Sequence, residues 1–429
     1  MTTKITEKNI SNLANVGVQW QSKVTSDGST VTTMAAGKGY FIDNTSAAGI
    51  VKLPTSASAG DSIVIKDYAG NFGTNSLTIQ RNGHNIQGVA NDGEIITNRA
   101  SLVLVYIDAT KGWLYTNESN VADLQQTQFI AATGGTVSTS GNFKIHSFTG
   151  DGCFVVSQAG VGSAPGKVDY LVVAGGGSGG IGNSNDGGGG GGAGGYRESS
   201  GAASGCYTAS PLGACVSGIT VTAQTYPITV GGGASTPGAN DSLGAKGSDS
   251  IFSTITSTGG GGGDGNGNPS PAHISPTVGS GGSGGGGHQS AGGSGNTPPV
   301  SPPQGNPGAS GATPTGTPSG AGGGGAGGAG NANAGTWNPG PNDAGEGGAG
   351  TTSHITGSPV ARAGGGGGAC SPGRPNVGAP GPGGSGGGGA GGNTGTSGSA
   401  NTGGGGGGGA NGNSGAGGTG IVVLRYKFQ

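Results

Sequence analysis

Glycine dominates the second part of the chain, and this stretch lies between two apolar segments. Of the 110 glycines in the 429-residue sequence, 90 follow residue 173. The first apolar segment is 169–174, Asp-Tyr-Leu-Val-Val-Ala, and the second is 420–426, Gly-Ile-Val-Val-Leu-Arg-Tyr. A disordered tail gains nothing from a final apolar strand, whereas a closed domain can pair that strand with the first one. The bracketing therefore predicts that the glycine-rich region is folded.

This region has few large side chains, so an ordinary apolar core cannot stabilise it. Ordering a glycine costs roughly 0.5–1 kcal/mol more than ordering an alanine. Dense backbone hydrogen bonding between closely approaching segments is the remaining source of stability. An extended helix with three residues per turn has no internal hydrogen bonds and points its amides outward. Residues 168–429 are therefore expected to form packed polyglycine II helices, one from each of the runs that begin at Gly187, Gly259, Gly284, Gly322, Gly364, Gly386 and Gly403.

Two other structures are compatible with glycine-rich sequence. A collagen helix needs a strict Gly-X-Y period, and runs such as 403–409 leave no X or Y residues. Disorder is the usual state of Gly/Ser-rich linkers. The terminal apolar strand favours the packed helices over both.

The first part of the chain is expected to be an antiparallel β-sandwich spanning 20–117. Short apolar segments there are separated by turn residues, which is typical of sandwich and jelly-roll modules. The most apolar segment, 101–108, is expected to be central and to pair with 112–116. Residues 1–19 are expected to serve as an attachment segment.

A smaller module is expected between the sandwich and the glycine-rich domain. Residues 118–167 contain a linker and two apolar segments, 143–148 and 153–156, separated by Thr-Gly-Asp-Gly. This pattern predicts a β-hairpin. The predicted fold class of the whole chain is therefore all-β.

Composition excludes several functions. Charged residues make up only 8% of the chain, and the net charge is −2. The 17 lysines and arginines are spread out, so no basic patch for nucleic acid is expected. No apolar run is long enough to insert into a membrane, and the N-terminus has no apolar segment typical of a secretory signal. The dinucleotide-binding pattern G-x-G-x-x-G occurs many times, but such matches are expected by chance in a chain this rich in glycine, so no cofactor is expected.

The reactive side chains give no catalytic or metal site. Gly-Gly-Ser-Gly-Gly at 281–285 matches a hydrolase motif, but a match is expected by chance in such a glycine-rich chain. The loop histidines are too far apart in sequence to suggest a metal centre and are expected to be solvated: His273, His288 and His354. We therefore expect no enzyme and no metal.

The four cysteines are Cys153, Cys206, Cys215 and Cys370. The spacing of Cys206 and Cys215 is too wide for a zinc knuckle. A small loop disulfide between these two is possible, and two free thiols are the alternative.

Scarce large side chains in the small-residue loops are the candidate binding residues, because aromatic and arginine side chains on a rigid scaffold are common binding anchors. They are Tyr196, Arg197, Tyr207, Trp337, Arg362 and Arg374. Trp337 could stack on a sugar or close the end of the helix bundle. Tyr196 directly follows a glycine run and could equally be structural.

Two parts of the chain resemble known phage proteins. Gly-Tyr-Phe-Ile-Asp at 39–43, followed by Leu-Pro-Thr-Ser-Ala-Ser-Ala-Gly-Asp at 53–61, resembles a β module of bacteriophage tail fibres. The segments 170–177, 190–197 and 420–426 resemble the glycine-rich domain at the ends of phage tail-fibre proteins, and are similar to the polyglycine-sandwich adhesins of T-even-like phages. In such adhesins a rigid scaffold presents variable distal loops to the host receptor.

The resemblance implies a tail-fibre or tail-tip protein of the virion, made in the host cytoplasm without a signal peptide. Its expected partners are a bacterial surface glycan or outer-membrane protein, other tail or baseplate proteins, and two further copies in a homotrimer. The alternative is a structural filament or virion subunit whose glycine lattice is mechanical. An ice-binding protein and a depolymerase are further options, and the sequence shows no threonine array for the former.

Overall fold

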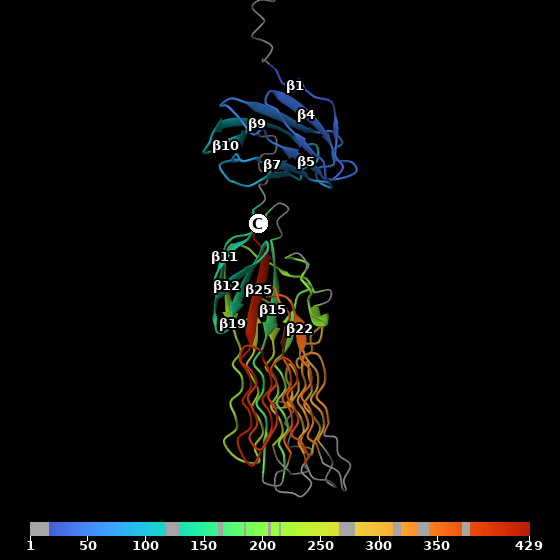
Figure 1. Ribbon diagram of the computed structural model, residues 1–429, viewed down its shortest axis with the longest axis vertical. Coiled ribbons are helices and arrows are strands. Elements are labelled where there is room, and N and C mark those ends of the chain that lie inside the picture. The colour runs from blue at the N-terminus through green and yellow to red at the C-terminus, as the bar shows by residue number, and fades with distance from the viewer. Residues whose placement is uncertain are drawn as a thin grey trace, which may run out of the picture. The chain divides into compact units, whose positions relative to one another are not determined.

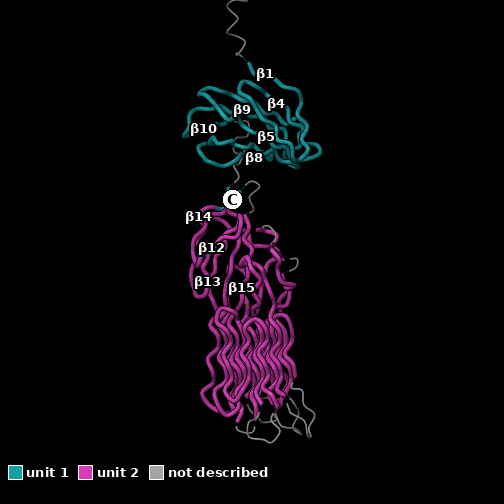
Figure 2. Tube along the Cα trace, in the orientation of Figure 1, with its two compact units in different colours: residues 1–129, 159–165 teal, residues 130–158, 166–429 magenta. Residues whose placement is uncertain are grey.

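The computed structural model contains two compact units (Figure 1). Unit 1 comprises residues 1–129 and 159–165, and unit 2 comprises 130–158 and 166–429 (Figure 2). The fold is all-β, as expected, because the described elements are strands apart from the short 3-10 helix η4 (Pro211–Gly213). No helix in the described part of the chain is long and apolar enough to cross a membrane. The structure describes residues 17–116, 128–161, 166–183, 186–204, 207–213, 216–265, 279–311, 319–332, 343–370 and 378–429.

Unit 1 has two sheets that share one apolar core. The first sheet contains, in spatial order, β1 (Gln19–Trp20), β4 (Lys38–Asp43), β6 (Ser62–Asp67), β9 (Ser101–Asp108) and β10 (Gly112–Tyr115), and β2 (Val24–Thr25) also pairs with β4. The second sheet contains β3 (Val31–Thr33), β5 (Gly49–Lys52), β7 (Leu77–Gln80) and β8 (Gly93–Ile95). The core between them includes the fully buried side chains of Ile42, Leu77 and Trp113.

The sequence predicted an antiparallel sandwich for unit 1, and this is wrong for the strand directions, because many neighbouring strands are parallel. β1 and β2 pair with β4 in parallel, and so do β4 with β6, β3 with β5 and β5 with β7. From β3 to β7 successive strands alternate between the two sheets. Consecutive strands of the same sheet, such as β4 and β6, therefore run in the same direction. Among the described strands of unit 1, the antiparallel pairs are β6–β9, β9–β10 and β7–β8. The pairing of β9 with β10 is the one expected for 101–108 and 112–116.

Unit 2 also begins with two sheets around a common core (Figure 1). The terminal-strand sheet contains, in spatial order, β12 (Thr136–Ser140), β13 (Phe143–Phe148), β25 (Ile421–Lys427), β15 (Lys167–Val173) and β17 (Tyr196–Glu198), with β18 (Ile219–Thr220) beside β15. The facing sheet contains β11 (Ala131–Thr133), β14 (Gly152–Gln158), β19 (Thr225–Thr229), β20 (Ser250–Phe252) and β21 (Ile255–Ser257). Two small pairs complete the unit: β16 (Ile181–Gly182) with β24 (Gly409–Ala410), and β22 (Thr351–Ser353) with β23 (Val360–Arg362).

The last strand closes unit 2, as its apolar sequence predicts. β25 lies between β13 and β15 and is antiparallel to both. Val422 is opposite Val172, and Val423 is opposite Leu171. All four of these side chains are fully buried. The two apolar segments that bracket the glycine-rich stretch are therefore neighbours in one sheet.

The expected β-hairpin of 143–148 and 153–156 is wrong. In the structure β13 pairs with β12 and β25, whereas β14 pairs with β11 and β19 in the facing sheet. Residues 149–151 thus connect two sheets instead of forming a hairpin turn. Both strands carry apolar side chains into the shared core, which favours placement on opposite sides of it. These strands belong to the compact unit that holds the glycine-rich residues and not to a module of their own.

Beyond the sheets, the glycine runs form a bundle of extended rods, side by side (Figure 1). In the rod 187–195, every third N–H donates to the same neighbouring rod. The neighbours reached in this way are 403–409, 258–264 and 320–326. Carbonyls of the same rod accept hydrogen bonds from 174–180, 283–286 and 364–369. This three-residue period is the one that an extended helix with three residues per turn requires.

Absence of side chains is what allows such close approach. A Cβ atom added to Gly190 would lie 2.0 Å from the carbonyl oxygen of Gly366, and one added to Gly191 would lie 2.2 Å from that of Gly177. Alanines do occur at the sheet end of the bundle, where Ala193 packs against apolar side chains such as Val173. The rods therefore require glycine because of contact between backbones, and not because of an unusual backbone conformation.

A buried histidine makes the stability of unit 2 depend on pH. The Nδ1 atom of His146 donates to the carbonyl oxygen of Gly134 at 2.7 Å, so Nε2 accepts from the hydroxyl of Tyr426 at 3.1 Å. Burial lowers the pKa of His146 from its usual 6.5, in spite of the hydrogen bond to Gly134. The unfolded chain therefore takes up a proton at higher pH than the folded chain, and stability falls as the pH drops through ~6.5.

We expect the melting temperature of unit 2 to be lower below this pH than above it. In the variant His146→Gln the difference between the two conditions should shrink, because the group that titrates is gone. Thermal unfolding followed by calorimetry measures both values. A variant with the same pH dependence as the original chain would contradict the role of His146.

Candidate functional site

The rods of unit 2 end in loops at the side away from the sheets (Figure 1). Hydrogen bonds place the ends of several rods at one level: Gly180 bonds to Gly189, and Gly188 bonds to Gly409. At their opposite ends, the rods 174–180, 187–195 and 415–420 run into β15, β17 and β25 respectively. We call the loop-bearing side the distal end of unit 2. Its described loops comprise 238–242, 288–292, 392–395 and 410–414, together with Asn183 and Asp186.

Small polar side chains cover the described part of the distal end. Its exposed residues include four amides and one carboxylate, namely Asn240, Asn393, Asn411, Asn413 and Asp241. No lysine or arginine lies in the described distal loops. Amide and carboxylate groups offer both donors and acceptors for hydrogen bonds, which suits a ligand with many hydroxyl or amide groups.

Hydrogen bonds between loops hold this end in place. The amide of Asn183 donates to the carboxylate of Asp241 at 3.1 Å, which joins two loops. Asp264, which is almost fully buried, accepts from the hydroxyl of Ser290 at 2.5 Å and from the backbone N–H of His288 at 3.3 Å. His288 in turn donates from Nδ1 to the carbonyl oxygen of Gly187 at 2.6 Å. Side-chain hydrogen bonds therefore hold these loops against the rods and against each other, in addition to the covalent connections at the two ends of each loop.

Two of the predicted binding residues are buried at the sheet end instead. Tyr196 in β17 is only 1% exposed, and its hydroxyl donates to Oε2 of Glu198 at 2.9 Å. Arg362 in β23 is 5% exposed. Burial raises the pKa of Tyr196 and lowers that of Arg362. The prediction that these two side chains contact a receptor is wrong, because neither can reach a ligand.

Arg197 and Tyr207 are half-buried and also lie at the sheet end. The Tyr207 hydroxyl donates to the carbonyl oxygen of Ser199 at 3.3 Å, and the guanidinium of Arg425 lies 5.4 Å from the centre of its ring. Burial raises the pKa of Tyr207. The structure therefore brings Tyr196, Tyr207 and Arg362 together around sheet-end carboxylates and not at the distal loops. Trp337, Arg374 and the cysteine pair Cys206 and Cys215 lie outside the described residues.

Two buried carboxylates, which sequence reasoning missed, organise this sheet-end cluster. Glu198 accepts from Tyr196, from the backbone N–H of Ser210 at 3.0 Å and from the hydroxyl of Ser353. Asp169 accepts from the hydroxyl of Ser199 at 2.7 Å and from Ser204. Both carboxylates thus attach loops to the terminal-strand sheet. Asp169 could have been found in the sequence, because an acidic residue within an otherwise apolar strand indicates a buried carboxylate with hydrogen-bond partners.

The structure bears on two reactive features considered in the sequence, the hydrolase-like motif and the histidines. Ser283, in the hydrolase-like motif, is fully buried within a rod, so no substrate can reach it. No group of three or more His, Cys, Asp or Glu side chains in the described ranges could hold a metal ion. The expectation of solvated loop histidines is corrected for His288, which is fully buried, whereas His354 is half-buried and His273 lies outside the described residues. Within the described part of the chain, neither Cys153 nor Cys370 forms a disulfide.

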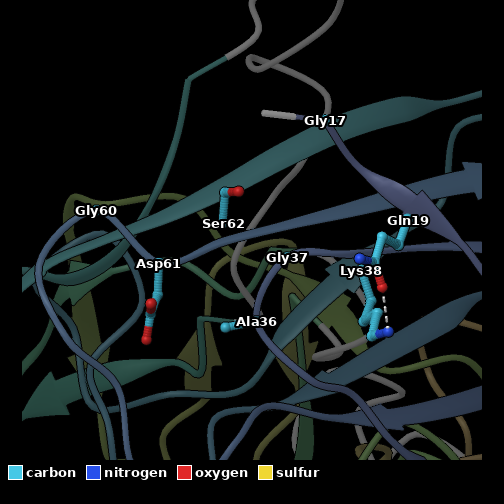
Figure 3. A pocket seen from close by; sticks show the side chains of 8 residues that line it. All are labelled: Gly17, Gln19, Ala36, Gly37, Lys38, Gly60, Asp61 and Ser62. Carbon is cyan, nitrogen blue, oxygen red and sulfur yellow. Dashed lines mark hydrogen bonds between the residues drawn. The ribbon is translucent and has the colours of Figure 1, made fainter. Parts of the chain in front are cut away.

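Unit 1 has a polar hollow of ≈ 460 Å³ at the start of its parallel strands (Figure 3). Much of its lining is backbone and small residues such as Gly37. The Nζ atom of Lys38 donates to Oε1 of Gln19 at 2.6 Å, so these two side chains bond to each other. Asp61 and Ser62 supply the remaining functional groups. The carboxylate of Asp61 already accepts a hydrogen bond from the N–H of Ser58, so it is a weak candidate for a catalytic group.

Comparison with known families gives one match. A model described as a glycine-rich domain matches residues 149–427. No curated protein matches the chain. The matched residues begin in the sheets of unit 2 and continue through all of its described rods to β25. Because this match covers more than half of the sequence, the chain belongs to the glycine-rich domain family.

Proposed function

We propose that this protein is a tail-fibre or tail-tip protein of a bacteriophage, and that its distal loops bind a receptor on the bacterial surface. The observation that supports this most is the lattice of rods, which carries many loops on one end of unit 2. Binding surfaces are commonly built from loops on a rigid scaffold. The receptor class is a surface glycan or an outer-membrane protein, and the role is binding without catalysis.

The chemistry of the described distal loops supports a polar receptor. Amide groups such as those of Asn393 and Asn413 are exposed and bond well to sugar hydroxyls. Backbone hydrogen bonds join these two loops, since Gly395 donates to the carbonyl oxygen of Asn413 at 2.9 Å. A rigid polar surface loses little conformational freedom when a ligand binds.

Binding of the labelled full chain to a panel of bacterial strains tests the proposal. We expect saturable binding to a few strains, weakened by the double variant Asn393→Ala, Asn413→Ala. The matched control is Asn142→Ala, which removes an exposed asparagine at the opposite end of unit 2 and should bind as the original chain does. If the folded chain binds no strain, the proposal is wrong. If the control variant loses as much binding as the double variant, the binding site does not lie at the distal end.

A structural role is the second candidate, because the same hydrogen-bonded lattice can act mechanically. In that case the folded chain would bind no cells and would assemble into filaments or with other virion proteins. Electron microscopy of the purified chain distinguishes the two. Filaments without cell binding would favour the structural role.

A further inference from the structure

The described residues contain two Asn-Gly pairs, one in each unit. Asn82 and Gly83 lie between β7 and β8 of unit 1, and Asn411 and Gly412 lie in the distal loop 410–414 of unit 2. Both asparagines have a positive φ, 50° and 69°, which asparagine tolerates in turns. An asparagine that precedes glycine can react with its own backbone, because glycine has no Cβ atom to shield its nitrogen. The surroundings of each pair therefore decide which one reacts.

A hydrogen bond restrains the side chain of Asn82. Its Nδ2 atom donates to the carbonyl oxygen of Leu53 at 2.8 Å, and the residue is half-buried. Reaction with the backbone requires the side-chain Cγ atom to turn toward the nitrogen of Gly83, and it requires Nδ2 to leave. The hydrogen bond to Leu53 opposes both movements.

Asn411 lacks this restraint. Its side chain is exposed, and no group in the described part of the chain forms a hydrogen bond with it. The backbone N–H of Gly412 also forms no hydrogen bond among the described residues. This N–H can therefore lose its proton to solvent, which makes the nitrogen a nucleophile next to a side chain that is free to rotate.

The fold keeps glycine at position 412. A Cβ atom added there would lie 2.8 Å from the carbonyl oxygen of Asn393. Hydrogen bonds fix the loop on both sides of the pair, since Ala410 donates to that same carbonyl at 3.2 Å and Gly395 donates to the carbonyl oxygen of Asn413 at 2.9 Å. The packing of the two distal loops therefore requires the residue that leaves Asn411 reactive.

We propose that Asn411 is a site of spontaneous deamidation in the folded protein. The deprotonated nitrogen of Gly412 attacks Cγ of Asn411, so that a bond forms between these two atoms. The bond from Cγ to Nδ2 breaks, Nδ2 takes up protons from water, and ammonia leaves behind a cyclic imide. Water then adds to one of the two imide carbonyls and opens the ring. The product is aspartate when the bond between Cγ and nitrogen breaks, and isoaspartate when the backbone bond breaks.

This reaction changes the chemistry of the distal end. An amide that donates and accepts hydrogen bonds becomes a carboxylate that only accepts them. The described distal loops contain no lysine or arginine to balance the new charge. Isoaspartate also lengthens the backbone between residues 411 and 412 by one carbon. Loss of receptor binding as the protein ages would rest on the proposed function, whereas the reaction itself does not.

Peptide mapping of the full chain by mass spectrometry, after storage at mildly alkaline pH for increasing times, tests the proposal. Fragmentation of each peptide assigns the mass change to one asparagine. We expect Asn411 to react at least about tenfold faster than Asn82 and Asn413, a difference of ~1.4 kcal/mol in activation free energy. Asn82 is the control for the restraining hydrogen bond. Asn413 is the control for glycine, because it is exposed but precedes Ser414.

The same mapping on the chain unfolded in denaturant separates structure from sequence. The bond to Leu53 is then lost, so Asn82 should react about as fast as Asn411, while Asn413 stays slower. In the folded variant Asn411→Gln the fastest step should disappear, because ring closure from the longer side chain is slower.

Three results would overturn the proposal. Asn411 that stays intact in the folded chain but reacts in the unfolded chain would show that the loop protects it. Asn413 that reacts as fast as Asn411 would show that exposure alone controls the rate. Equal rates at Asn82 and Asn411 in the folded chain would show that the hydrogen bond to Leu53 gives no protection. None of these measurements needs a receptor, so they stand apart from the test of binding.

Discussion

Replacing Gly191 with alanine is expected to destabilise unit 2 by at least ~3 kcal/mol, which is the upper part of the range for overpacking a core. The new Cβ atom would lie 2.2 Å from the carbonyl oxygen of Gly177 and 2.8 Å from that of Ser178. Both contacts are with backbone, so no side chain can rotate away. The neighbouring rods are held by hydrogen bonds on several sides and cannot shift alone.

Calorimetry measures this effect, with a matched control at Gly232. A Cβ atom added to Gly232 meets nothing within 4 Å, and Gly232 is exposed. Gly232→Ala should therefore be neutral or slightly stabilising, since alanine restricts the unfolded chain. The melting temperature of Gly191→Ala should fall by roughly 6–12 °C. Equal melting temperatures for the two variants would show that the rods separate easily.

Two features of the glycine-rich unit can be predicted from the sequence: the pairing of the last strand with the first, and the three-residue repeat of the rods. An apolar strand of seven residues needs partners on both sides, and β15 offers the matching apolar sequence. In rods at the outside of the bundle, the sequence also shows which residues face the neighbouring rods. Gly244 and Gly247 are buried, whereas Ala245, Lys246 and Ser248 between and after them are exposed. A glycine at every third position thus marks the side of a rod that contacts its neighbours.

Strand direction and long-range pairing could not be predicted in the same way. Alternating apolar residues fit a parallel and an antiparallel neighbour equally well, so the parallel pairs of unit 1 left no mark in the sequence. Phe143–Phe148 and Cys153 are close in sequence, which favoured a hairpin, but β13 pairs with residues 422–427 and β14 pairs with 225–228. Partners so distant in the sequence cannot be identified from a local turn.

None of the described residues predicted for the site lies in the distal loops. Large side chains are scarce in this chain, and the apolar core needs them as much as a binding surface does. Tyr196 and Arg362 were expected at a receptor, but the core beside the terminal-strand sheet needs volume that glycine and alanine cannot supply. The exposed polar residues of the described distal loops are mostly asparagines instead. Short polar residues between glycine runs are ambiguous in sequence, since turns and binding loops favour the same types.

Loss of the last strand is expected to prevent unit 2 from folding while unit 1 stays folded. Deleting residues 421–429 removes β25, which is hydrogen-bonded on both edges and has both of its faces buried. Val422, Leu424 and Tyr426 belong to the core between the two sheets, and Ile421 and Val423 belong to the core on the other face. The rods have little side-chain burial of their own to compensate. Calorimetry should therefore show the transition of unit 1 alone.

A single substitution tests the same contribution without removing the chain end. Leu424→Ala should destabilise unit 2 by about 2–5 kcal/mol, because it leaves a cavity in a packed core. Val137→Ala, in the edge strand β12 of the same sheet, changes a side chain that is 48% exposed and should alter stability by about 0.5 kcal/mol or less. If the truncated chain keeps the transition of unit 2, or if the two substitutions act equally, then the hydrogen bonds between rods hold the lattice together without the returning strand.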